Sequence, residues 1–122
     1  MMFKQALQSI VEKTDGAIGA VIMGTDGLPV EKYFDDEGRE SNLDVAAAEF
    51  TSLIRAAARS AKDLNLGDVS ELVVSLESVT LLMRALHKDY FVFLALRSDG
   101  NLGRGRYELR KAELMLAEEF AV

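Results

Sequence analysis

The spacing of hydrophobic positions changes several times along the chain, and each period predicts an element. Helical spacing at the start predicts a first helix over residues 2–14, with a buried stripe of Phe3, Leu7, Ile10 and Val11. The next segment, Ala17 to Gly24, is apolar at nearly every position, which predicts a strand covered on both faces. Thr25-Asp26-Gly27 is a hairpin signal, and Leu28 to Phe34 is the returning strand. Because Pro29 cannot donate a ladder hydrogen bond, this strand is expected at a sheet edge.

The longest pattern runs from Asn42 to Leu64, a stretch without Gly or Pro that is rich in good helix formers. Apolar residues spaced by three and four make one seam, which consists of Leu43, Ala47, Phe50, Ile54, Ala57, Ala61 and Leu64. Ala46, Leu53 and Ala56 flank it. This band is wider than a helix needs to cover its own sheet. Two interpretations stay open: a central core helix, or a helix that serves both its own sheet and a second copy of the chain.

Three closely spaced strands and a final helix follow. The segments Glu71 to Leu76, Val79 to Leu86 and Tyr90 to Leu96 are separated by short turns and predict an antiparallel meander. The last helix is expected from Asn101 to about Phe120. The expected fold is therefore a three-layer α/β/α sandwich, with elements in the order αββαβββα and a five-stranded antiparallel sheet. The long helix would cover one face and the two terminal helices the other, in a single domain over residues 1–122.

Composition narrows the functional classes. The chain is 49% hydrophobic and contains no Cys, so it is an ordinary globular sequence without a disulfide framework or a cysteine-based zinc site. No membrane-spanning run or signal-peptide core is present, which points to the cytoplasm. The net charge of −6 disfavours nonspecific nucleic-acid binding.

No residue pattern predicts an active site, a cofactor or a metal. A P-loop motif is absent, and Gly103 and Gly105 at the start of the last helix are better explained by close packing than by anion binding. The single histidine, His87, falls in a predicted turn without other metal ligands nearby. A basic cluster lies on the last helix; its residues are Arg104, Arg106, Arg110 and Lys111. It is interpreted as a solvated helix face, with docking of an acidic partner as the alternative.

One edge of the predicted sheet favours self-association. The strand Glu71 to Leu76 is expected at the edge opposite Pro29, and its Leu72-Val73-Val74 core has neither a charge nor a proline to deter pairing. Edge pairing and packing of the helix seam would together form one homodimer interface. The expected interface residues are Leu43, Ala47, Phe50, Ile54, Ala57, Ala61, Leu72, Val73 and Val74.

Two segments give the whole chain a resemblance to the roadblock (dynein light-chain) family, and to its stand-alone bacterial members in particular. The first is the opening hairpin, GAIGAVIMGTDGLPV, in which a strand ends in a D-G turn. The second is Asn101-Leu102-Gly103, followed by Arg106 and the helix ELRKAELML. Arg104 and Gly105 stand where family members typically have an aliphatic pair.

The resemblance implies a homodimer that binds a small Ras-like GTPase and alters its nucleotide cycle, by activation or exchange, without an active site of its own. No matching family arginine exists, so no arginine finger is assigned. The expected partner surface comprises Asp44, Thr51, Ser52, Arg55, Arg59 and Lys62. A non-catalytic dimeric scaffold or adaptor is the alternative function. A small-molecule sensor is a third hypothesis; it requires a ligand-sized cavity, and none is expected because large apolar side chains should fill the core.

Overall fold

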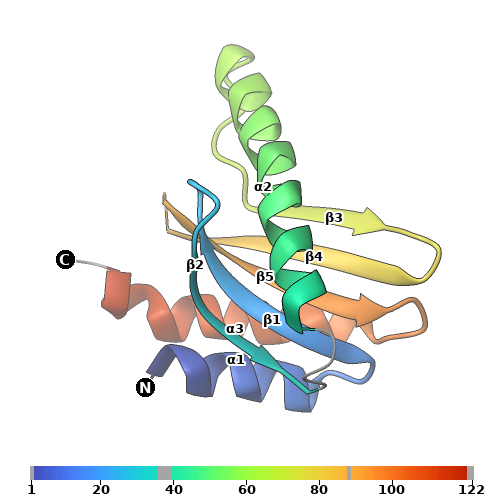
Figure 1. Cartoon of the computed structure of the whole chain (residues 1–122). Helices are drawn as coiled ribbons and strands as arrows, with labels where there is room; N and C mark the ends of the chain where they lie inside the picture. The colour runs from blue at the N-terminus through green and yellow to red at the C-terminus, as the bar shows by residue number, and fades with distance from the viewer. Residues whose placement is uncertain (1, 36–39, 88, 121–122) are drawn as a thin grey trace.

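A computed structural model describes residues 2–35, 40–87 and 89–120, and it confirms the predicted order of elements. Figure 1 shows how the helices and strands are arranged. Their bounds are α1 (Met2–Lys13), β1 (Ala17–Gly24), β2 (Pro29–Phe34), α2 (Glu40–Asp63), β3 (Glu71–Ser75), β4 (Val79–His87), β5 (Tyr90–Arg97) and α3 (Leu102–Phe120). Among the described residues, no helix is long and apolar enough to cross a membrane.

The five strands form one antiparallel sheet in the order β2-β1-β5-β4-β3. Strands β1 and β2 form one hairpin, and β3, β4 and β5 form a meander. The two groups join at the centre of the sheet, where β1 pairs with β5, and the residues of these two strands are almost all buried. Strands β2 and β3 are the two edges, and Pro29 lies in β2 as expected. The sheet therefore has one edge that carries a proline and one that does not.

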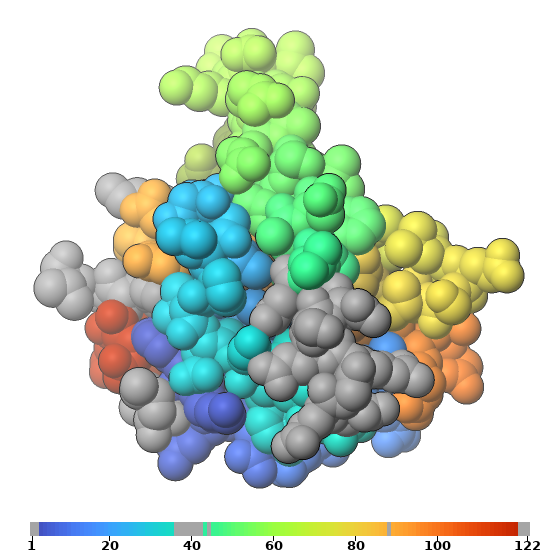
Figure 2. All heavy atoms as spheres, viewed as in Figure 1, coloured from blue at the N-terminus to red at the C-terminus, as the bar shows by residue number. Residues whose placement is uncertain are grey.

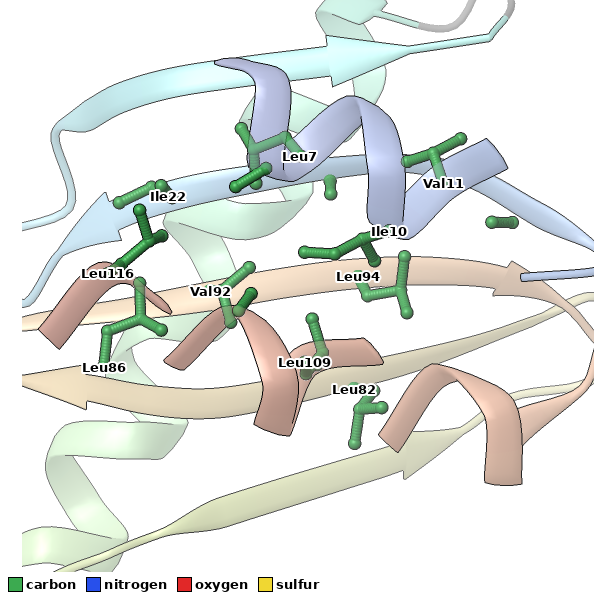
Figure 3. Packing of buried hydrophobic residues seen from close by; sticks show 14 of the residues in the cluster. Leu7, Ile10, Val11, Ile22, Leu82, Leu86, Val92, Leu94, Leu109 and Leu116 are labelled. Carbon is green, nitrogen blue, oxygen red and sulfur yellow. The ribbon is translucent and has the colours of Figure 1, made fainter. Parts of the chain in front are cut away.

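Helices α1 and α3 cover one face of the sheet and enclose the larger apolar cluster (Figure 3). The stripe that α3 turns toward the sheet consists of Gly105, Leu109, Ala112 and Leu116, all of which are buried. At Gly105 a Cβ atom would lie 3.1 Å from Cδ2 of Leu94, so the glycine lets α3 approach the sheet closely. This agrees with the packing role expected for Gly105 from the sequence.

The two connecting segments that precede β1 and α3 are held together by backbone hydrogen bonds. The amide of Asn101 donates to the carbonyl of Asp15 at 2.9 Å, and the amide of Arg97 donates to the carbonyl of Gly16 at 2.8 Å. Gly16 has a φ of +85°, and a Cβ atom there would lie only 2.5 Å from Cα of Gly100. The side-chain oxygen of Asn101 accepts the amide of Arg104 at 2.9 Å and caps the start of α3. The Asn-Leu-Gly motif thus has a local structural role.

Helix α2 lies on the opposite face, above the second apolar cluster. In Figure 1 it crosses the sheet obliquely, and its C-terminal half continues beyond the strands. Figure 2 shows the same half standing out from the body of the molecule. A single oblique helix leaves part of this sheet face uncovered, in contrast to the face that α1 and α3 share.

Candidate interaction site at the β3 edge and the α2 face

The free edge of β3 presents backbone groups for pairing. The amide of Leu76 donates to the carbonyl of Val79 at 2.9 Å, and the amide of Ala85 donates to the carbonyl of Ser70 at 3.0 Å. Hydrogen-bonded and non-hydrogen-bonded pairs alternate along an antiparallel ladder, so Val73 and its partner Leu82 form a non-hydrogen-bonded pair. The N–H and C=O of Val73 consequently point away from β4, toward the open edge.

The side chains of β3 divide between the two faces of the sheet. Leu72 and Val74 pack against the cluster under α2, whereas Val73 packs against the cluster under α1 and α3. All three are only half-buried. These three of the nine residues predicted for the dimer interface therefore lie at the free edge, with apolar surface still exposed.

The apolar seam of α2 also divides into two parts. Leu43 and Ala47 are 8% and 0% exposed and pack on the chain's own sheet, so their assignment to a free dimer surface requires correction. Phe50 and Ile54 are partly buried against the same cluster. Farther along the helix, the seam continues with Ala57 and Ala61, which are half-exposed. The first half of α2 serves its own sheet, and the second half remains available.

An apolar groove of about 810 Å³ opens beside the first half of α2. Its floor comes from the sheet, its walls come from α2 and the β3–β4 turn, and Arg97 and Asp99 lie at its rim. The apolar residues that line it are Ile18, Leu43, Ala46, Phe50, Leu76, Val79, Leu81 and Ala95. The groove is open to solvent and lies beside the packed core, not inside it; it exists because one helix does not cover five strands.

The residues predicted to contact a partner do not form one uniform surface. Thr51 must be removed from it, since Thr51 is 1% exposed and its hydroxyl donates to the carbonyl of Ala47 at 2.9 Å. Ser52, Arg59 and Lys62 are exposed. Arg55 is exposed as well, but its guanidinium donates to the carbonyl of Thr25 and ties α2 to the β1–β2 hairpin. The side chain of Asp44 lies outside the described residues.

The described part of the chain holds no cluster of three or more side chains suited to a metal ion. His87 differs from its expected place in a turn, because it is the last residue of β4 and pairs with Tyr90. Gly103 lies in the exposed first turn of α3, and Gly105 faces the sheet. The β3 edge, the groove beside α2 and the projecting half of α2 are all incompletely buried.

Comparisons with known proteins identify the class to which this arrangement belongs. The Roadblock/LC7 domain family matches residues 3–98, and the chain belongs to this family. MglC from Myxococcus xanthus is 36% identical in sequence, with a TM-score of 0.75 over 98% of this chain and 100% of that one. Among curated proteins, no sequence matches.

Two further solved structures share the fold at lower identity. A Roadblock/LC7 domain from Streptomyces avermitilis has a TM-score of 0.86 at 18% identity, over 98% of each chain. The gliding protein MglB from Thermus thermophilus has a TM-score of 0.78 at 19% identity, over 93% of this chain and 84% of that one. The family and fold that the sequence suggested are therefore confirmed.

Proposed function

We propose that the chain acts as a homodimer that regulates a small Ras-like GTPase and contributes no active site of its own. The proposed dimer rests on three incompletely buried features, namely the open edge of β3, the apolar groove beside α2, and the projecting half of α2. Pairing of two β3 edges about a two-fold axis would bring the second copy's α2 toward the groove and the seam of the first. One interface would then both pair the open backbone groups of β3 and bury the exposed apolar side chains.

The regulatory role rests on the family and on the exposed side of α2. Roadblock proteins of the stand-alone bacterial type, which this chain resembles, are expected to act on a GTPase and not as enzymes themselves. Ser52, Arg59 and Lys62 leave a polar, partly basic surface on α2, away from the sheet. In the proposed dimer two such surfaces would lie on the same side of the joined sheet, where one partner protein can contact both helices.

The test is a capture experiment from the native cell extract, with the purified chain as bait and either GDP or a non-hydrolysable GTP analogue present. Recovery of a Ras-like GTPase in one nucleotide state supports the regulator, and mass spectrometry identifies the partner. The variant Arg59→Glu should weaken that recovery, whereas Lys32→Glu on the opposite sheet edge serves as its control. Partners recovered equally with both nucleotides would instead favour the scaffold, in which the dimer joins other proteins without affecting nucleotide turnover.

A further inference from the structure

The outer side of α3, on the face of the sheet opposite to α2, carries an unusual layering of charge. Glu108 is 1% exposed, and its carboxylate lies under Arg104, at 2.8 Å from Nη2, and under Lys111, at 3.5 Å from Nζ. Both cations remain partly exposed, with side chains 45% and 37% accessible. The carboxylate is therefore beneath the surface and the two cations are on top of it.

The same layering is repeated toward the β3 edge. Glu71 and Glu113 are only 25% and 30% exposed, and they pair with Arg84, whose side chain is 14% exposed. Above them, Arg106 lies 3.1 Å from Glu71 and is 48% exposed. Arg110 is 61% exposed and lies 4.0 Å from Glu113, which is too long for a strong ion pair. The cations again form the outer layer.

The net charge of this cluster is positive, whereas the net charge of the whole protein is negative. Five basic side chains share three carboxylates, which leaves two positive charges uncompensated in a chain whose net charge is −6. A long polyanion such as a nucleic acid, or an extended anionic membrane, would meet the negative remainder of the molecule as well. A short acidic segment would meet only the cluster. The charge distribution thus favours a peptide-sized partner.

Apolar surface continues from the cluster along the same side of α3. Tyr107, Leu114 and Met115 are 57%, 67% and 56% exposed. The ring of Tyr107 lies within 5.4 Å of the Arg104 guanidinium and 5.7 Å of the Lys111 ammonium, so it connects the charged and apolar parts. A hollow of about 150 Å³ between α1 and α3 lies beside Met115 and is large enough for one apolar side chain. At successive helical turns, α3 therefore exposes basic and then apolar groups.

We propose that this outer side of α3 docks an acidic amphipathic helix from another protein. Its carboxylates would pair with Arg104 and Arg110, and its apolar side chains would cover Leu114 and Met115. Along α3, successive exposed side chains are spaced by three, three and four residues at Arg104, Tyr107, Arg110 and Leu114, which the side chains of a second helix can match. The contacts at Arg104, Leu114 and Met115 lie on the face of the sheet opposite to α2. The part of the cluster nearest β3, where Arg106 pairs with Glu71, borders the proposed dimer interface.

The test uses a fluorescein-labelled peptide of about 16 residues with Glu and Leu at amphipathic helical spacing, titrated with the purified chain and read by fluorescence anisotropy. The double variant Arg104→Gln/Arg110→Gln should bind about two- to thirty-fold more weakly, the range expected when two partly exposed ion pairs are lost. Leu114→Gln should weaken binding as well. The matched control, Lys13→Gln/Lys32→Gln, removes the same charge from the end of α1 and from β2 and should leave the affinity unchanged.

Arg104 pairs with a buried carboxylate, so the double variant requires a check of folding by circular dichroism. The single variant Arg110→Gln avoids this concern because Arg110 is the most exposed of these cations, and it should still reduce affinity. The proposal is overturned if the peptide does not bind, or if all variants bind equally. It is also overturned if single-stranded RNA or phosphatidylserine vesicles bind more tightly than the peptide through the same arginines, because the site would then serve a polyanion.

Discussion

The substitution Val73→Pro isolates the role of the β3 edge, because it changes an amide that the single chain does not use in its ladder. The N–H of Val73 points away from β4, as the alternation between the bonds at Leu76 and Ala85 requires. Proline is tolerated in an edge strand when its missing N–H would have faced solvent. The fold of the single chain should therefore persist, whereas pairing with another strand loses a donor at the middle of the five-residue strand.

The expected loss of affinity follows from symmetry. Each copy carries the substitution, so a two-fold interface loses at least two hydrogen bonds. At a net value of about 0.5–1.5 kcal/mol per bond, the dimer should lose about 1–3 kcal/mol. Since about 1.4 kcal/mol corresponds to a factor of ten, its dissociation constant should rise about 5- to 150-fold. This is a lower bound, because the pyrrolidine ring also obstructs the approach of a second strand.

Sedimentation velocity over a concentration series measures the dissociation constant directly, and thermal unfolding followed by circular dichroism reports on the fold. The opposite edge offers a matched control in Lys32→Pro. The amide of Lys32 donates to the side chain of Glu31 at 3.1 Å and does not enter the ladder with β1, so it too faces outward. Lys32→Pro should leave dimerisation intact. A Val73→Pro protein that dimerises as tightly as the unmodified chain would refute pairing through β3.

Two further substitutions examine the seam and the core. Ala57→Glu places a charge in the projecting half of α2. Because Ala57 is half-exposed, the single chain should still fold, but burial of the charge against a second copy should lower the dimer affinity at least about ten-fold. Ser52→Glu, on the exposed side of α2, is the control in the same sedimentation assay. Leu109→Ala opens a cavity at a position that is 0% exposed, between α3 and the sheet. It should reduce the free energy of unfolding by about 2–5 kcal/mol, measured by urea denaturation, and a loss under about 1 kcal/mol would contradict the packing described for α3.

The fold could be predicted from the sequence because the spacing of apolar residues distinguishes its helices from its strands unambiguously. Continuous apolar runs placed Ala17 to Gly24 and Tyr90 to Leu96 at the centre of the sheet, and Pro29 marked one edge. Short turns between the strands left few alternatives to an antiparallel meander. The family resemblance, carried by the hairpin and by the Asn-Leu-Gly motif, agreed with that interpretation.

The finer features of the site depend on geometry that spacing does not encode. Leu43 and Ala57 belong to one apolar seam, yet Leu43 is 8% exposed on the sheet, whereas Ala57, in the second half of α2, is half-exposed. Thr51 resembled a surface residue because it is polar, yet its hydroxyl is satisfied by a carbonyl of its own helix. The groove was missed because residue volumes predict how a core fills, but not how much of a sheet one helix covers. On α3, the sequence showed that acidic and basic residues are both present, but it did not show that the carboxylates lie beneath the cations.

The two edges of the sheet differ in a way that limits how many copies can join. Strand β2 begins with Pro29, shows an irregular register opposite Ile22 and Met23, and carries the charged pair of Glu31 and Lys32, all of which oppose the addition of a strand. If β3 pairs with β3, each copy uses its one receptive edge, and both ends of the joined sheet are then β2 strands. Growth stops at a pair. A sheet with two receptive edges would polymerise, so in the proposed dimer the proline of the second strand would limit the size of the assembly from the far side of the domain.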